Sequence, residues 1–140
     1  MKVDFHYEVD FRLEDSLKFS DWISRIIEKE NSSLGNLSYI FCDDEYLSNI
    51  NLEYLNHDTL TDIITFDYTE NNTISGDVFI SVERVKENAE GFKVEFRTEL
   101  LRVMSHGVLH LLGYNDKGEE EKAEMRNKES EMIELFHVEQ

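Results

Sequence analysis

The spacing of apolar residues changes from the period of a strand to the period of a helix near the start of the chain. Apolar and polar residues first alternate, as they do in a half-buried strand. The apolar residues of this stretch are Val3, Phe5, Tyr7, Val9 and Phe11. Behind Asp15 and Ser16, which can cap a helix, apolar residues then recur every three or four positions from Phe19 to Ile27. The sequence therefore predicts a strand followed by a helix.

The same periodicities predict the remaining elements. Residues 37–42 are typical of a buried strand, and Asp43 or Asp44 can cap a helix that follows it. Residues 61–68 and 76–81 are rich in β-branched and aromatic side chains, and the polar segment between them predicts a hairpin. Further helices are expected at about residues 82–91, 94–112 and 119–136. This order predicts an α+β fold, in which a mixed sheet of about four strands packs with four to five helices.

The chain has the features of one globular domain. It has 140 residues and no proline, so no linker divides it, and we expect residues 1–140 to form a single domain. Hydrophobic residues make up 40% of the chain, which argues against disorder. Cys42 is the single cysteine, which excludes an internal disulfide and fits a reducing compartment. The chain lacks a signal-like hydrophobic run and the roughly 18 apolar residues of a spanning helix, so we expect a cytoplasmic protein away from membranes.

The charge of the chain is strongly acidic. The 31 acidic residues exceed the 14 Lys and Arg residues, which gives a formal net charge of −17 with neutral histidines. Such a field favours solubility and repels nucleic acid as a whole. Any binding of nucleic acid would therefore depend on a local basic surface or on a partner.

Two histidines lie four positions apart near the end of the predicted helix at residues 94–112. His106 and His110 would share one helical face and could present both imidazoles to a single metal ion. Gly113 follows at a position where a left-handed residue can end the helix, and the chain can then bring Asp116 to the same ion. Zinc accepts carboxylate oxygen as well as imidazole nitrogen. The sequence therefore predicts one zinc ion per chain, with His106, His110 and Asp116 as its ligands.

The spacing of these residues matches the frame of a metzincin-like active-site helix with two changes. Asp116 stands where the proteases have a third histidine, and Gly107 stands where they have a glutamate. That glutamate is the general base of the proteases, so its absence argues against proteolysis by their route.

Several other residues could serve this site or could be purely structural. Ser105 could bind substrate or simply face solvent, and Asp77 could orient a metal ligand or form a turn hydrogen bond. We expect structural or exposed positions for His6, His57 and His137, and a packed core position for Cys42. We expect four basic residues to be ordinary solvated charges unless the fold gathers them into a strip: Lys86, Lys93, Arg97 and Arg102.

The segment HGVLHLLGYND at residues 106–116 resembles the hallmark H-G-x-L-H-L-x-G-Y-D-H of the bacterial YbeY family. Every defined position through Tyr114 matches. Residues 51–68 and the segment SGDVFIS resemble two further motifs of the family, and the similarity covers nearly the whole chain. The resemblance implies a metal-dependent hydrolase domain, and Gly107 is the residue that this family has in place of the protease glutamate.

The resemblance also implies a function. The YbeY proteins are zinc-dependent endoribonucleases, so we expect a hydrolase that cuts single-stranded RNA in the maturation of the 3′ end of 16S ribosomal RNA and in ribosome quality control. The expected partners are ribosomal RNA, the small ribosomal subunit and its proteins, and an assembly GTPase, with the chain taken as a monomer. Two alternatives remain: a non-catalytic ribosome-assembly factor with a structural zinc, or a metal-dependent hydrolase of another substrate.

Four positions depart from the family pattern, and one of them is Asn115, which takes the place of an aspartate. Asp116 takes the place of the third histidine, Leu55 that of an arginine implicated in activity, and Leu60 that of a proline. An arginine could hold the scissile phosphate, which leucine cannot do. Arg97 or Arg102 on the histidine-bearing helix could substitute for it. The catalytic residues themselves are not identified by the sequence.

Overall fold

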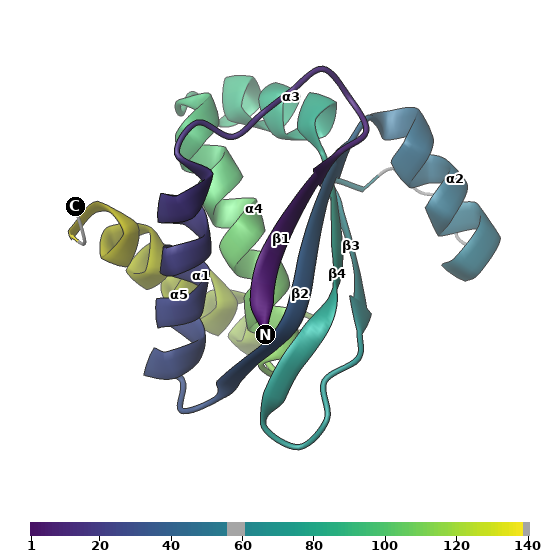
Figure 1. Ribbon diagram of the computed structural model, residues 1–140. Helices are drawn as coiled ribbons and strands as arrows, with labels where there is room; N and C mark the ends of the chain where they lie inside the picture. Colours follow the sequence, from purple (N-terminus) through teal and green to yellow (C-terminus); the bar gives the residue numbers. More distant parts are fainter. Residues whose placement is uncertain (56–60, 139–140) are drawn as a thin grey trace.

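The computed structural model describes residues 1–55 and 61–138 of the chain, and its elements follow the predicted order. The strands are β1 (Lys2–Tyr7), β2 (Ser33–Cys42), β3 (Ile63–Asp67) and β4 (Thr73–Ser81). The helices are α1 (Ser16–Lys29), α2 (Asp44–Leu55), α3 (Val82–Phe92), α4 (Phe96–Leu111) and α5 (Glu119–Val138). Within the described residues, four strands and five helices confirm the predicted α+β class (Figure 1).

The strands form one mixed sheet in the order β1-β2-β4-β3. β1 pairs with β2 and β2 with β4 in parallel, while β3 and β4 pair in antiparallel fashion. The predicted hairpin of β3 and β4 is therefore confirmed. It places β3 at the sheet edge, where its first residue, Ile63, lies opposite Ile80 of β4.

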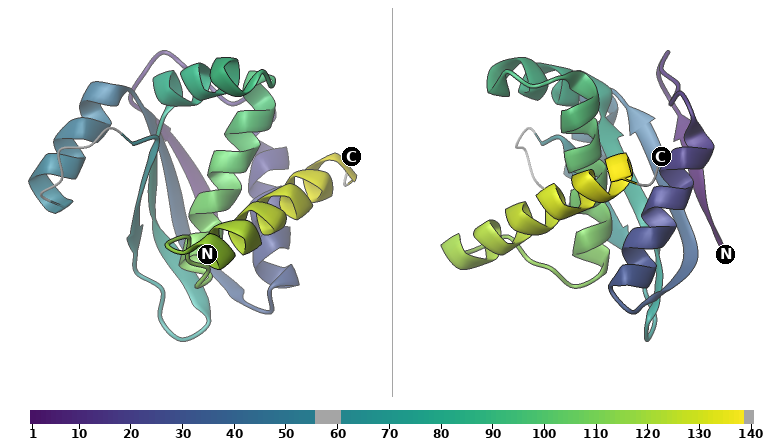
Figure 2. Two further views of the ribbon diagram at one scale, coloured as in Figure 1. Left: turned by 180° about the vertical axis from the view of Figure 1, so that it is seen from behind. Right: turned by 90° about the vertical axis from the view of Figure 1, so that its left-hand side faces the viewer.

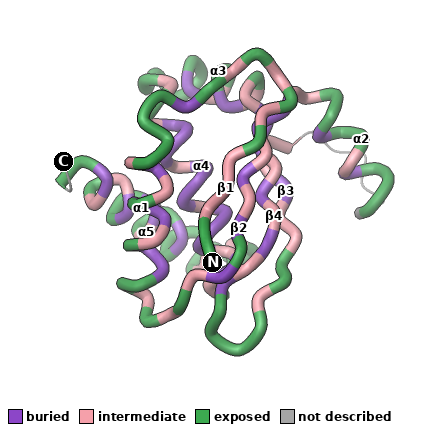
Figure 3. The backbone as a smooth tube through the Cα atoms, viewed as in Figure 1, coloured by how far each residue is buried: buried purple, intermediate pink, exposed green. Residues whose placement is uncertain are grey.

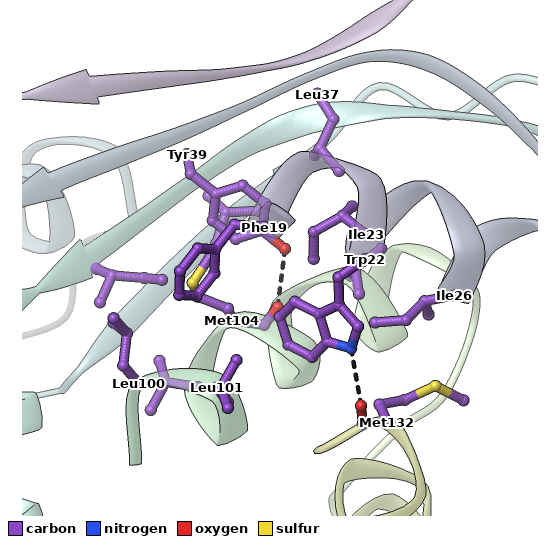
Figure 4. Close-up of a cluster of buried hydrophobic side chains, with 14 of the residues drawn as sticks. Phe19, Trp22, Ile23, Ile26, Leu37, Tyr39, Leu100, Leu101, Met104 and Met132 are labelled. Atoms are coloured by element: carbon purple, nitrogen blue, oxygen red, sulfur yellow. Dashed lines mark hydrogen bonds between the residues drawn. The ribbon is translucent and has the colours of Figure 1, made fainter. Parts of the chain in front are cut away.

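The helices α1, α4 and α5 lie on one face of the sheet, whereas α2 projects beyond its other side (Figures 1 and 2). The main hydrophobic core lies between the sheet and this helical layer, where the buried residues concentrate (Figure 3). Two buried hydrogen bonds join elements across this core (Figure 4). Trp22 Nε1 of α1 donates to the carbonyl of Met132 in α5 at 2.7 Å, and the Tyr39 hydroxyl of β2 donates to the carbonyl of Met104 in α4 at 2.8 Å. They satisfy the polar atoms of two large side chains that the core would otherwise leave without partners.

A smaller apolar cluster lies beneath α2 on the other face of the sheet. Cys42, Leu47 and Ile64 are buried there. Cys42 is thus the packed core thiol that the sequence predicted, and it is a free cysteine. Burial, together with the nearby charges of Asp43 and Asp44, raises the pKa of its thiol to about 12. A thiol with this pKa stays protonated at neutral pH and is a poor metal ligand or nucleophile.

Some element ends differ from the prediction. The first strand ends at Tyr7, so Val9 and Phe11 lie beyond it, although the Phe11 ring still packs against Phe41 with 5.3 Å between ring centroids. Asp15 precedes α1 in a left-handed conformation, with a φ of 63°, and its side chain makes no capping hydrogen bond. By contrast Asp43 caps α2 as expected, because its Oδ1 accepts from the backbone N–H of Tyr46 at 2.8 Å.

No helix within residues 1–55 and 61–138 combines the length and the apolar character needed to cross a membrane.

Candidate metal centre

His106 and His110 lie one turn apart in the C-terminal half of α4. Their ring centroids are 4.5 Å apart, and the ring planes are inclined at 82°. The helix buries a wide face against the sheet and α5, and both histidines stand at the margin of this face, with 21% and 28% of their side chains exposed. The helical period therefore brings two imidazoles to one solvent-accessible point, as the sequence predicted.

The turn after α4 carries the third group of the cluster. Gly113 has a φ of 105°, a left-handed value that few side-chain-bearing residues adopt. The backbone N–H of Gly113 donates to His110 O at 3.0 Å, and that of Tyr114 donates to Leu109 O at 3.0 Å, which ends the helix. The chain then reverses, and Asp116 Oδ2 lies 3.3 Å from His106 Nε2 and 3.5 Å from His110 Nε2.

The donor set of His106, His110 and Asp116 fits a zinc ion. The three ligand atoms lie within 4.8 Å of one another. Two zinc bonds of about 2.1 Å at a tetrahedral angle place their ligand atoms about 3.4 Å apart, close to the two distances measured to Asp116 Oδ2. Two imidazole nitrogens and one carboxylate oxygen also belong to the ligand types of catalytic zinc sites. The cluster could therefore hold a metal ion.

The cluster opens into a cavity whose opposite wall is the β3 edge. The cavity has a volume of about 380 Å³ and is lined by the three candidate ligands together with Thr61, Asp62, Ile63 and Thr65. With 39% of its side chain exposed, Asp116 is the most accessible of the three. A ligand bound to the ion would therefore face the segment that leads into β3.

Glu129 of α5, which no sequence motif pointed to, supports the cluster. It is buried, and its Oε2 lies 2.6 Å from His106 Nδ1. Burial lowers the pKa of His106, but the hydrogen bond with Glu129 and the charges of Glu129 and Asp116 outweigh it, so the pKa is raised. If Nδ1 carries the proton of the neutral imidazole, Glu129 accepts a hydrogen bond from Nδ1–H. The lone pair of Nε2 is then free to bind a metal ion beside Asp116.

Arg102 holds the other oxygen of Glu129. Its Nη1 donates to Glu129 Oε1 at 3.0 Å, and its Nη2 donates to Ser130 Oγ at 3.4 Å. The guanidinium compensates the charge of a carboxylate that is only 5% exposed. Of the two arginines proposed to substitute for the family residue, Arg102 thus points toward the site. Arg97 instead lies over the rings of Phe19 and Phe136.

Gly107 faces the sheet rather than the metal cluster. A Cβ at this position would lie 2.8 Å from Val78 Cγ1 and 3.1 Å from Ile63 Cδ1. The glycine therefore permits the close approach of α4 to β4 and β3. A glutamate at this position has no room in the present packing, which gives a structural reason for the departure from the protease frame.

A second cavity adjoins the cluster on its α5 side. It has a volume of about 350 Å³, and its lining includes His106, Asp116, Asp62 and Glu99. Burial raises the pKa of the Asp62 carboxyl, although a backbone hydrogen bond and the nearby His106 oppose the shift. Burial and the nearby charge of Asp62 likewise raise the pKa of Glu99. Two of the acidic groups beside the cluster thus bind protons more readily than ordinary carboxyls do.

The structure assigns other positions to the remaining candidates from the sequence. Ser105 is fully buried, and its hydroxyl donates to Arg102 O at 2.9 Å, so neither a substrate contact nor a solvated position is correct. Asp77 interacts with Tyr68 and does not line either cavity beside the cluster. Of the two roles open to it from the sequence, orientation of a metal ligand belongs instead to Glu129. The exposed His137 lies beside Phe136. The side chain of Leu55, and residues His57 and Leu60, lie outside the described part of the structure.

The chain is similar to known proteins of a single family. The family model described as endoribonuclease YbeY matches residues 6–137. The chain belongs to this family. Relatives described as endoribonuclease YbeY include one from Flavobacterium johnsoniae, which is 56% identical over 99% of both chains. Another from Christiangramia forsetii is 55% identical over 99% of this chain and 97% of its own.

The fold is also that of a solved relative. A Thermotoga maritima protein known from a solution structure is 26% identical and superposes with a TM-score of 0.69, over 98% of this chain and 90% of its own. The resemblance to the YbeY family that residues 106–116 suggested is therefore confirmed. The YbeY relatives are named endoribonucleases, which are hydrolases that act on RNA.

Proposed function

We propose that this chain is a zinc-dependent endoribonuclease that matures ribosomal RNA, with the ion held by His106, His110 and Asp116. The observation that carries the proposal is a cluster of three ligands open to a cavity of about 380 Å³. Structural zinc sites are usually closed by four protein ligands, whereas catalytic sites have three and leave a position for water or substrate. Membership of the YbeY family supports RNA as the substrate.

The residues around the cluster have separate roles in this chemistry. A zinc ion held by these residues would supply a Lewis acid, able to polarise a phosphoryl oxygen and to lower the pKa of water toward neutrality. Glu129 orients His106 through Nδ1, and Arg102 keeps Glu129 in place. Gly107 provides no base. The carboxyl of Asp62 lines both cavities, so it is the group that we assign to receive the proton of the attacking water.

The family and the charge of the chain support proposals about the location, the RNA target and the partners of the protein. We infer a cytoplasmic protein that acts on single-stranded RNA near the 3′ end of 16S ribosomal RNA and in ribosome quality control. The net charge of −17 opposes unassisted binding of RNA. Ribosomal proteins of the small subunit or an assembly GTPase would then bring the monomer to its substrate. Tight binding of naked RNA at low salt, with a salt slope far steeper than the roughly 1.4 that two phosphate contacts give, would contradict this delivery.

One observation favours a non-catalytic assembly factor with a structural zinc. His106 joins α4 to α5 through Glu129, so an ion bound to His106 would also strengthen the attachment of α5. The open three-ligand geometry argues for the nuclease over this alternative. The remaining alternative, hydrolysis of another substrate, does not extend to peptides by the metzincin route, because position 107 has no room for the required glutamate.

Metal content and RNA processing in the same set of variants test the proposal. Mass spectrometry of the native wild-type chain should find about one zinc per chain, and His106→Ala and Asp116→Ala should lose it. Both variants should fail to cut a precursor of ribosomal RNA, while His137→Ala, which changes an exposed histidine, keeps the metal and the activity. Folded, metal-free variants that process the precursor as the wild type does would instead support the assembly factor.

A further inference from the structure

The cavity on the α5 side of the cluster has two walls of different chemistry. Figure 2 shows α5 crossing α4, with α3 at the opposite end of α4. Phe92, at the end of α3, lines one wall, and Lys122 and Arg126 of α5 line the other. His106 and Asp116 of the metal cluster line the same cavity. An aromatic ring, two cations and the candidate catalytic centre therefore share one space of about 350 Å³.

The two cations are available to a ligand. Lys122 and Arg126 lie four positions apart on α5, so they share one face of the helix. Neither makes an ion pair or a side-chain hydrogen bond within the described residues, although the charge of Arg126 is close enough to Glu99 to lower the pKa of that carboxyl. Arg102, which lines the same cavity, is committed to Glu129. In a chain of net charge −17, unpaired cations gathered beside a metal cluster are a local exception to the repulsion of polyanions.

The acidic groups of this cavity weaken the attraction of an anion less than their number suggests. Four carboxylates line it, those of Asp62, Glu99, Asp116 and Glu129. Glu129 is paired with Arg102, and Asp116 would be a metal ligand, so two of the four charges are already committed. If all four carboxyls are ionised, they and the three cations Arg102, Lys122 and Arg126 give the lining a net charge of −1. A bound divalent ion changes this net charge to +1.

Phe92 has a surface suited to a nucleobase. It is 57% exposed although large and apolar, and its ring stacks on no other ring within the described residues. Bases stack on exposed aromatic side chains without regard to sequence, because every base has a π-face. We propose that this cavity binds a nucleotide adjoining the scissile phosphate of RNA, with Phe92 stacked on its base and Lys122 and Arg126 in contact with backbone phosphates. The inference rests on the proposed function, since it takes RNA as the substrate.

Binding of a labelled RNA tests the two walls separately. The zinc-loaded full chain is titrated against a fluorescein-labelled single-stranded RNA of about ten nucleotides at several salt concentrations, with fluorescence anisotropy as the signal. The double variant Lys122→Gln/Arg126→Gln should bind about tenfold more weakly. It should also reduce the slope of log affinity against log salt by about 1.4, at about 0.7 for each phosphate contact of a single strand. Phe92→Ala should also lose about tenfold in affinity but leave this slope unchanged, and Phe92→Tyr should restore the affinity.

Matched controls separate these effects from general ones. Lys29→Gln/Lys86→Gln makes the same change of charge at exposed positions that do not line the cavity, and Tyr68→Ala removes another exposed aromatic ring. Circular-dichroism melting curves verify that each variant is folded. The inference is overturned if the Lys122 and Arg126 variant and Phe92→Ala each match their controls in affinity and salt slope.

A cleavage assay on the same RNA distinguishes this failure from that of the proposed function. If the wild-type chain cuts the RNA and the variants match their controls in affinity and salt slope, the nuclease function is supported and the subsite is contradicted. If the wild-type chain binds the RNA with the expected dependence on Phe92, Lys122 and Arg126 but does not cut it, the subsite is supported and the nuclease function is contradicted.

Discussion

Glu129 Oε2 lies 2.6 Å from His106 Nδ1, and this pair joins the last helix to the metal cluster. The carboxylate is buried and is held by Arg102 on its other oxygen. A carboxylate on the far nitrogen of a ligating histidine fixes the ring orientation and raises the basicity of the metal-binding nitrogen. The relationship therefore makes α5 a functional part of the site as well as a cover for the core.

Replacement of Glu129 should weaken metal binding. We expect Glu129→Gln to lower the zinc affinity by about tenfold and Glu129→Ala by up to about 100-fold, because the amide keeps a hydrogen-bond acceptor but loses the charge. Competition with a chromophoric chelator measures both constants. Glu134→Gln, an exposed change on the same helix, provides the control. Equal zinc affinities in all of these variants would show that Glu129 has only a structural role.

The third ligand offers a second prediction. Asp116→Ala should lose the metal, whereas Asp116→His should keep it, because histidine occupies this position in the family pattern and also binds zinc. A neutral ligand leaves one more unit of positive charge on the ion, so the pH midpoint of RNA cleavage should fall in Asp116→His. Metal analysis and a pH profile of cleavage measure the two effects. A His variant without metal would indicate that the turn after Gly113 fits only a carboxylate.

The order of the elements was predictable from the sequence because it depends on local periodicity. Alternation and helical spacing are properties of neighbouring residues, and so is the helix end at Gly113, whose left-handed conformation the structure confirms. The first strand was extended too far for the same reason. Phe11 continues the alternation of apolar residues, but it packs on the core from beyond the end of the strand. Periodicity does not distinguish an apolar residue within a strand from one that packs on the core after the strand has ended.

The support of the metal cluster was not predicted because it depends on contacts distant in sequence. Glu129 lies on the buried face of α5 with Met125, Met132 and Phe136. A charged residue within this apolar stripe was the one sequence signal that Glu129 has a buried partner. Its partner His106 lies on another helix, and only the crossing of α4 and α5 identifies it. The basic strip considered in the sequence also divides in space, since Arg97 packs on aromatic rings while Arg102 turns to Glu129.

Gly107 should be intolerant of a side chain. Gly107→Ala places a methyl group against Val78 and Ile63, and we expect a loss of about 1–3 kcal/mol in the free energy of unfolding, despite the better helix propensity of alanine. Gly91→Ala is the matched control in α3, where an added Cβ meets nothing within 4 Å, and it should gain up to about 1 kcal/mol. Urea denaturation measures both values. Similar values for the two variants would rule out tight packing at Gly107.

Glu99 should make the stability of the fold depend on pH. Burial and the charge of Asp62 raise its pKa above the ordinary value of 4.5. Between 4.5 and the raised pKa the folded state binds more protons than the unfolded state, so this group makes stability fall as pH rises. Glu99→Gln removes the titration, and it should stabilise the chain at neutral pH while making little difference below pH 4.5. Urea denaturation of the variant and the wild type across this pH range measures the difference, with the exposed change Glu90→Gln as the control. A difference that is constant with pH would mean that burial does not raise the pKa of Glu99 in the folded chain.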